Sequence, residues 1–249
     1  MKTKITFLGT ANAVPNKKQQ NSHLIVELSE RKILIDCVGT PVVRLQEAGI
    51  NSLEITDLIL THFHPDHVSG VPLLLMDLWL LGRKEPLAIY GIHDVLQRVD
   101  EMMGLYRWET WDGFYPVNFY PIPEVDQFLI IEDEQIQVWS SPVSHIIPCI
   151  GLRMQFPDGT MAYSSDTAPC EAMFRLAEGA DILIHEATGE MPGHSSPEQA
   201  GQIARQAGVK TLYLTHYPGN IDHQDYINRA RDSFSGEIWI AQDLMTISF

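Results

Sequence analysis

The feature that most constrains this chain is a group of metal-binding side chains at the end of an apolar segment. Residues 55–63 read ITDLILTHF, which predicts a buried strand. The group occupies six positions and consists of His62, His64, Asp66 and His67. Residues two apart share one face of a strand, and Pro65 should end that strand. Imidazoles and carboxylates are ligands that zinc favours, so the pattern predicts metal binding rather than a chance cluster of surface histidines.

Three further candidates stand where other apolar runs stop. His145 closes IQVWSSPVSH, Asp166 follows MAYSS, and His216 ends TLYLTH. Functional side chains commonly emerge where strands end and loops begin. Each of these residues alone could be an ordinary strand-end residue, so their role depends on the set as a whole.

The order of the set resembles that of the metallo-β-lactamase superfamily, and the match covers essentially the whole chain. The resemblance implies a four-layer αββα sandwich, with the site at one edge between the sheets. It also implies two divalent metal ions, zinc in the first instance, with manganese or iron as alternatives. One ion would be held by His62, His64 and His145, the other by Asp66, His67 and His216, with Asp166 bridging.

Several motifs resemble the ribonuclease Z branch of this superfamily. They are FLGTANAVP (7–15), VSHIIPCIGLR (143–153), SSDTAPC (164–170) and HEATGEMPGHSSPEQA (185–200). The resemblance implies that His194 lies beside the scissile phosphate as an acid or charge stabiliser, and not as a metal ligand. The alternative is a histidine on an exposed turn. Asp66 would bind metal and also orient or accept the proton of the attacking water.

The chain also departs from a ribonuclease Z that processes tRNA. That branch carries a tRNA-gripping arm, which would lie between Arg153 and Met161, where only MQFPDGT is present. Lys17-Lys18-Gln19-Gln20 replaces an arginine expected after Pro15, and Tyr217-Pro218-Gly219 replaces the usual Ser and Arg. The expected substrate is therefore a small or cyclic phosphate ester. Alternatives are tRNA 3′ processing, lactone or thioester hydrolysis, and non-catalytic ligand binding on the same scaffold.

The charge distribution points the same way. The formal net charge is −15, and residues 100–134 contain nine acids against one base, Arg107. Such a surface repels polyanions at long range, so long RNA is a less favoured partner than a small ester.

The remaining pattern predicts one domain over residues 1–249. Strands are expected at 5–10, 22–28, 32–37, 87–91, 136–143, 151–156, 160–165, 181–186 and 210–216. Helices are expected after Pro41 and at 71–81, 93–105, 170–178, 197–207 and 223–234. Ser196, Pro197 and Gln199 form a capping-box signature, and Gly208 should end that helix.

Other features set the expected environment. Three cysteines without a paired framework favour the cytoplasm, and no apolar run is long enough for a membrane span. The aromatic segment 107–123 could form a substrate wall, a homodimer contact or a cover over a helix. His23, His93 and His223 are expected at the surface or near the ligands, and His185 at a strand end or near the ligands.

Overall fold

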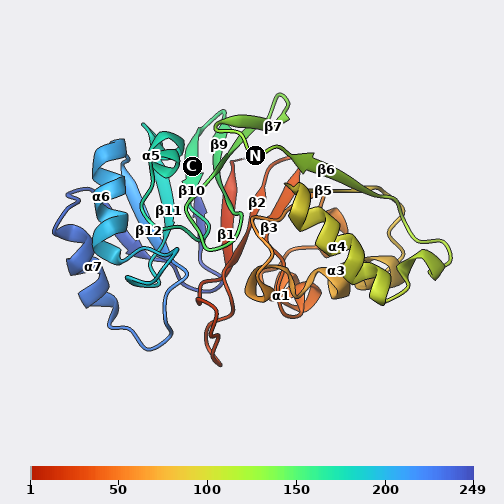
Figure 1. Cartoon of the computed structure of the whole chain (residues 1–249). Helices are drawn as coiled ribbons and strands as arrows, with labels where there is room; N and C mark the ends of the chain where they lie inside the picture. The colour runs from red at the N-terminus through yellow and green to blue at the C-terminus, as the bar shows by residue number, and fades with distance from the viewer. Residues whose placement is uncertain (1) are drawn as a thin grey trace.

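Two seven-stranded sheets form the centre of the computed structural model, which describes residues 2–249. The first sheet has the order β14-β1-β2-β3-β4-β5-β6 and the second β13-β12-β11-β10-β9-β8-β7. Helices α1, α3 and α4 lie outside one sheet, and α5, α6 and α7 lie outside the other (Figure 1). This arrangement is the expected four-layer αββα sandwich.

The strands of the first sheet are β1 (Lys4–Gly9), β2 (His23–Glu27), β3 (Lys32–Ile35), β4 (Asp57–Ile59), β5 (Leu87–Ile92), β6 (Val117–Ile122) and β14 (Thr246–Ser248). Those of the second are β7 (Phe128–Glu132), β8 (Gln137–Pro142), β9 (Ile150–Phe156), β10 (Gly159–Tyr163), β11 (Ile182–Glu186), β12 (Thr211–Thr215) and β13 (Glu237–Ile240). The helices are α1 (Pro41–Glu47), α2 (Pro65–Val68), α3 (Val71–Leu80), α4 (His93–Leu105), α5 (Glu171–Ala177), α6 (Pro197–Ala207) and α7 (His223–Arg231), with short 3-10 turns at Ser52–Glu54 and Trp108–Thr110.

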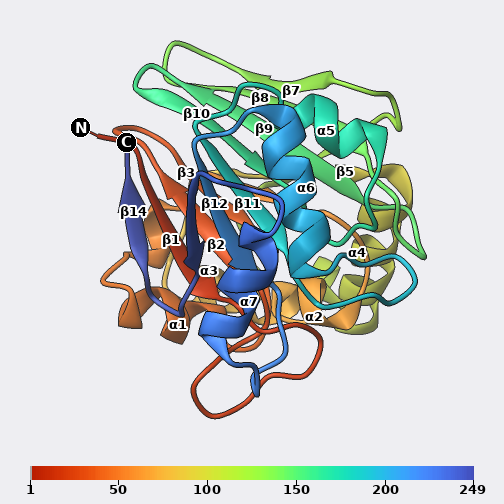
Figure 2. The same ribbon diagram turned by 90° about the vertical axis from the view of Figure 1, so that its left-hand side faces the viewer.

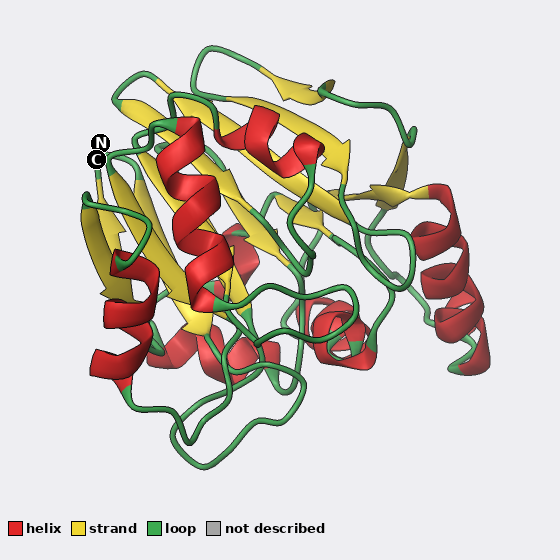
Figure 3. Cartoon of the chain, turned by 60° about the vertical axis from the view of Figure 1, so that its left-hand side comes forward, coloured by secondary structure: helices red, strands yellow, loops and turns green. Residues whose placement is uncertain are grey.

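Each sheet combines an antiparallel part with a parallel part. Strands β1, β2 and β3 form the expected antiparallel meander, in which Ile5 pairs with Val26 and Ile25 with Leu34. Strands β3 to β6 then run parallel, as do β10 to β13 in the second sheet. Parallel neighbours need crossover connections, and helices supply several of these on the outer faces (Figures 2 and 3).

Side-chain alternation divides the interior into two apolar regions. In β11, Ile184 belongs to the large core between the sheets, whereas Leu183 packs under α5 and α6. In β12, Tyr213 faces the first region and Leu212 the second. This period of two explains why strands covered on both faces are apolar almost throughout.

Helix α6 begins and ends as its sequence predicts. The Ser196 hydroxyl accepts a hydrogen bond from the Gln199 N–H, and the Gln199 side chain returns one to the Ser196 backbone. Gly208 follows the helix in the left-handed conformation, with φ of 68°. The helix packs closely on α7, because a Cβ at Gly201 would lie 2.4 Å from the carbonyl oxygen of Ala230.

Several strands differ from the sequence expectations. The strand expected over 55–63 is shorter, because β4 ends at Ile59 and the chain leaves the sheet before the first histidine. The edge strands β6, β7, β13 and β14 are not in the predicted set. The aromatic segment 107–123 covers a helix of its own chain, which is one of the three roles that its sequence allows: the Trp111 ring stacks on Trp79 of α3, with centroids 5.2 Å apart.

Strands β9 and β10 are joined by the shortest kind of hairpin connection. Phe156 pairs with Gly159, so only Pro157 and Asp158 lie between the strands. The Asp158 carboxylate accepts hydrogen bonds from the backbone N–H and the hydroxyl of Thr3, at 3.1 and 2.8 Å. The chain thus turns directly back where an arm would begin.

Within residues 2–249, no helix combines the length and apolar character that crossing a bilayer requires.

Candidate metal centre

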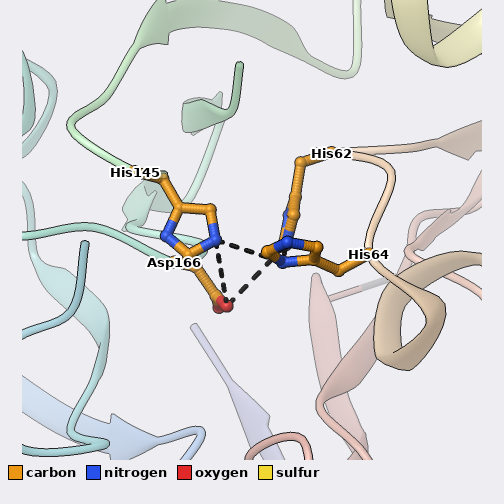
Figure 4. A group of neighbouring side chains, drawn as sticks. All are labelled: His62, His64, His145 and Asp166. Atoms are coloured by element: carbon orange, nitrogen blue, oxygen red, sulfur yellow. Dashed lines mark hydrogen bonds and ion pairs between the residues drawn. The ribbon is translucent and has the colours of Figure 1, made fainter. Parts of the chain in front are cut away.

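The seven residues expected to hold metal converge at one edge of the two sheets. They form two groups in which the potential ligand atoms lie within 4.8 Å of one another: His62, His64, His145 and Asp166 in the first, and Asp66, His67 and His216 in the second. Figure 4 shows the side chains of the first group pointing toward one another. Asp166 and His216 also form an overlapping group with His194.

Both sheets supply residues to this edge. From the first sheet, the loop after β4 carries His62 and His64, and Pro65 starts the short helix α2 that presents Asp66 and His67. From the second sheet, His145 follows β8, Asp166 follows β10 and His216 follows β12. The two histidines of the first loop are therefore brought together by a loop beyond the strand, and not by the strand itself.

The backbone is strained where it delivers these side chains. Three of the six non-glycine residues with positive φ within residues 2–249 lie here: Asp36 at 60°, Ser165 at 51° and His216 at 50°. Ser165 immediately precedes Asp166. Such conformations cost free energy and persist where the surrounding structure enforces them, commonly at functional sites.

Asp166 lies between the two groups and directs one carboxylate oxygen to each. Its Oδ2 lies 3.7 Å from Nε2 of His62 and 4.0 Å from Nε2 of His145. Its Oδ1 lies 3.5 Å from Nε2 of His67 and 3.3 Å from Nε2 of His216. A carboxylate placed in this way can bridge two cations.

The hydrogen-bonding state of these atoms fits divalent ions. Nε2 of His67, Oδ1 of Asp166 and Nε2 of His216 are all buried, and none has a hydrogen-bond partner in the described structure. A buried polar atom without a partner costs roughly 1–3 kcal/mol. A cation at this point would satisfy all three atoms at once, and the nitrogen and oxygen donors suit zinc.

Metal binding requires unprotonated imidazole nitrogens, and three of the proposed ligands meet this condition without a metal. Burial lowers the pKa of His62, His64 and His145, so these rings are neutral near pH 7. Burial also opposes charge on His67, but Asp166 and Asp36 outweigh it and raise the pKa of that ring. Burial alone would raise the pKa of Asp166, yet His216 and His67 lower it well below its usual range. Asp36 and Asp166 therefore favour a positive charge at the second group, which a bound cation can supply in place of the proton on His67.

His194 lies beside the centre and is held by Glu186. Its Nδ1–H donates to Oε1 of Glu186 at 2.9 Å, and its ring stacks on His216 with centroids 5.7 Å apart. Burial would lower the pKa of His194, but the hydrogen bond and charge of Glu186 raise it. The sequence prediction placed His194 at the site but missed Glu186. The signal was available, because Glu186 ends the buried strand β11 within the motif HEATGE.

Other ligand-orienting contacts were also missed from sequence. Nδ1 of His67 donates to Oδ2 of Asp36 at 2.7 Å, and Nδ1 of His216 lies 2.8 Å from the Thr188 hydroxyl. Nδ1 of His145 donates to the carbonyl of Gly193 at 2.8 Å. Gly193 adopts a φ of 78°, and a Cβ there would lie 2.8 Å from that same nitrogen. Such contacts fix which ring nitrogen faces the centre.

The remaining histidines lie outside both groups. His93 and His223 are exposed, as expected. His23 and His185 are fully buried within β2 and β11, so a surface position for His23 is wrong. This burial had no signal in the sequence, because His23 directly follows the polar residues Asn21 and Ser22 at the start of β2.

Comparison with known proteins identifies the family of this chain. Residues 3–235 match the family described as "Anti-Pycsar protein Apyc1". A curated ribonuclease Z from Methanothermobacter thermautotrophicus is 29% identical over 303 aligned positions, covering 98% of this chain and 95% of the relative.

Two solved structures have the same fold over nearly their whole lengths. YhfI from Bacillus subtilis, a metallo-β-lactamase fold protein, aligns with a TM-score of 0.84 at 23% identity, covering all of both chains. The short form of human tRNase Z aligns with a TM-score of 0.80 at 26% identity, covering 98% of each. This chain is thus a metal-dependent hydrolase of the ribonuclease Z-like branch of the metallo-β-lactamase superfamily, and it belongs to the anti-Pycsar protein Apyc1 family.

Proposed function

We propose that this chain hydrolyses phosphodiesters with two divalent metal ions, most simply zinc. The observation that carries the proposal is Asp166, whose two oxygens face separate groups of nitrogen donors. The first ion would be held by His62, His64 and His145, the second by Asp66, His67 and His216, with Asp166 bridging. Bound ions would supply Lewis acidity, which polarises a phosphoryl oxygen and makes water more acidic.

The chain's own residues would then move the protons. The Asp66 side chain is 13% exposed, so it reaches the open side of the centre. Burial would raise the pKa of Asp66, but contacts with His216 and His67 lower it, and the carboxylate is therefore ionised near pH 7. An ionised carboxylate in this position can orient the attacking water and accept its proton.

His194 would serve the leaving group. Glu186 accepts a hydrogen bond from the Nδ1–H of His194, so Nε2 of His194 is the nitrogen left to face a substrate. The raised pKa of His194 favours the protonated ring, which can stabilise the phosphoryl oxygens or donate a proton to the departing alkoxide. An ester or thioester hydrolase needs no such acid beside the metals, so His194 supports phosphate chemistry.

For the substrate we favour a small or cyclic phosphodiester. Two residues join β9 and β10, so the chain has no arm there to grip a long RNA. Residues 100–134 add a net charge of −8, since nine acids face one base. Affinity for a polyanion rests on several Lys and Arg contacts, whereas a single phosphate needs only the centre itself.

Precursor tRNA is the second candidate, and the names of the curated relatives support it more than they support a small ester. Those relatives are called ribonuclease Z, and one solved neighbour is the short form of human tRNase Z. The alignment with the archaeal relative, however, spans 303 positions against 249 residues here. At least 54 positions of that alignment (303 − 249) therefore have no counterpart in this chain.

A competition assay on the zinc-loaded protein at about 0.15 M salt separates the candidates. The panel contains bis-p-nitrophenyl phosphate, 2′,3′- and 3′,5′-cyclic nucleotides, a precursor tRNA, a homoserine lactone and a glutathione thioester. We expect the highest kcat/KM on a small diester. Accurate 3′ cleavage of the tRNA at equal or higher kcat/KM would establish the second candidate instead. Activity confined to the lactone or thioester would overturn phosphodiester hydrolysis altogether.

A further inference from the structure

A single buried carboxylate, Asp36, is linked to both candidate metal groups, to His67 directly and to His62 through Thr61. It follows β3, is completely buried and adopts the left-handed conformation, with φ of 60°. Among residues 2–249, no lysine or arginine forms an ion pair with it; its one ionic contact is His67. A buried carboxylate without a cation is costly unless several donors satisfy it, so the hydrogen bonds to Asp36 show what it supports.

The contact with the second group is direct. Oδ2 of Asp36 lies 2.7 Å from Nδ1 of His67. Because a carboxylate oxygen can only accept, Nδ1 carries the proton and donates it. Nε2 of His67 is therefore the nitrogen that faces Asp66 and Asp166, at 3.7 and 3.5 Å.

The contact with the first group runs through the Thr61 hydroxyl. Thr61 Oγ1 lies 3.0 and 2.9 Å from the two oxygens of Asp36, and 3.1 Å from Nδ1 of His62. A hydroxyl has one proton, which goes to the carboxylate. Its lone pair then accepts the Nδ1–H of His62, so Nε2 of His62 is the nitrogen that faces Asp166.

We propose that Asp36 is a positioning residue that sets one histidine in each metal group, His67 directly and His62 through Thr61. This inference rests on the proposed two-metal function. It makes an asymmetric prediction: loss of the Asp36 carboxylate weakens both metal sites, whereas loss of the Thr61 hydroxyl weakens only the first. Removing a partner that orients a metal ligand typically costs about 10- to 100-fold in metal affinity.

Asp36→Gly and Asp36→Asn test the first half of this prediction. Glycine and asparagine both tolerate positive φ, so neither substitution strains the backbone. Stepwise zinc affinities are measured by competition with a chromophoric chelator, and cobalt absorption reports the geometry of each site. We expect Asp36→Gly to weaken both steps about 10- to 100-fold, with Asp36→Asn between it and the wild type. Asp57→Asn is the matched control, because Asp57 is equally buried but pairs with Arg31 away from the centre.

Thr61→Val and Thr61→Ser test the prediction that loss of the Thr61 hydroxyl weakens only the first metal site. This test remains decisive even if the Asp36 variants fold poorly. Valine keeps the shape and removes the hydroxyl, so one affinity step should weaken about 10-fold or more while the other stays unchanged. Serine restores the hydroxyl and should restore the affinity. Equal weakening of both steps by Thr61→Val, or no weakening, would overturn the inference. If the wild type itself bound no metal, the proposed function would fail, which is a distinct result.

Discussion

His194 donates its Nδ1–H to Glu186 across 2.9 Å while its ring lies nearly parallel to that of His216, at an interplanar angle of 13°. Glu186 is itself fixed, because its carboxylate also accepts backbone N–H groups of Thr167, Thr188 and Ser195. The acid beside the candidate metal centre is thus held in one orientation by a buried carboxylate.

His194→Ala should lower kcat on the preferred phosphodiester by about 10²- to 10⁴-fold, the usual contribution of a general acid. Zinc content should stay near two equivalents by elemental analysis, because His194 lies outside the seven proposed ligands. His93→Ala, which removes an exposed histidine at the start of α4, is the control and should change neither quantity. A full rate in His194→Ala would remove His194 from the mechanism.

Glu186→Gln should move the pH–rate profile. Glutamine can still accept the Nδ1–H of His194, but it lacks the charge that raises the pKa of that ring. The protonated, active form of His194 is then lost at a lower pH than in the wild type. The alkaline limb of kcat against pH should therefore shift to lower pH, and an unshifted limb would argue against the Glu186 role.

Removal of proposed ligands should lower metal content. Asp166 faces both groups, so Asp166→Ala should reduce zinc from about two equivalents toward none and abolish turnover. His64 lies in the first group alone, so His64→Ala should leave about one equivalent bound. Elemental analysis after gel filtration measures both. Two equivalents retained by Asp166→Ala would contradict the bridging assignment.

The site was easier to predict from sequence than its support, for a physical reason. His62, His64, Asp66 and His67 lie within six positions, and each remaining ligand candidate ends an apolar run, so local pattern sufficed. Asp36 and Thr61 gave no local sign, because their contacts with the ligands arise only when β3 and β4 lie side by side. The single domain, cytoplasmic location and homodimer stay predictions.

The fold was predictable where elements are long and covered on both faces. The meander and helices α4 and α6 follow from hydrophobic period and caps. The edge strands β6 and β7 did not, because β6 contains Pro121 and β7 is a short apolar run, so neither sequence alternates cleanly between apolar and polar residues. The strand before the histidines was overextended in the prediction, since an apolar run continues past Ile59 although pairing stops there.

His23 should make stability depend on pH. Burial lowers its pKa to about 4, against about 6.5 in the unfolded chain. The unfolded state then binds the extra proton first, so this contribution is complete above pH 6.5 and is lost as pH falls toward 4. The loss is about 2–3 kcal/mol of unfolding free energy by pH 4.5.

Denaturant unfolding of wild type and His23→Gln at pH 7 and pH 4.5 measures this effect. The free energy of the wild type should fall more steeply than that of the variant, whatever their difference at pH 7. The exposed His93→Gln should follow the wild type. Parallel pH profiles for wild type and His23→Gln would show that His23 titrates normally in the folded chain.

Two helical glycines should respond to alanine in opposite directions. A Cβ at Gly201 would lie 2.4 Å from the Ala230 carbonyl oxygen, so Gly201→Ala must separate α6 from α7 and should destabilise by about 1–3 kcal/mol. Gly104 in α4 has nothing within 4 Å of its Cβ position, so Gly104→Ala should stabilise by about 0.5–1 kcal/mol. Thermal and denaturant unfolding measure both, and a neutral Gly201→Ala would mean that the helix contact is looser than described.

The two metal groups draw side chains from both sheets, and His62 and His216 are 154 positions apart (216 − 62). The unfolded chain cannot assemble such a set without closing a very long loop, so ions would bind almost only after both sheets have docked. The bound ions would then also hold the two sheets of the sandwich together. Zinc at 100 times its Kd would add about 2.7 kcal/mol to the free energy of unfolding. A chelator would therefore abolish the activity and also lower the free energy of unfolding. Zinc scarcity would then shorten the lifetime of the folded chain.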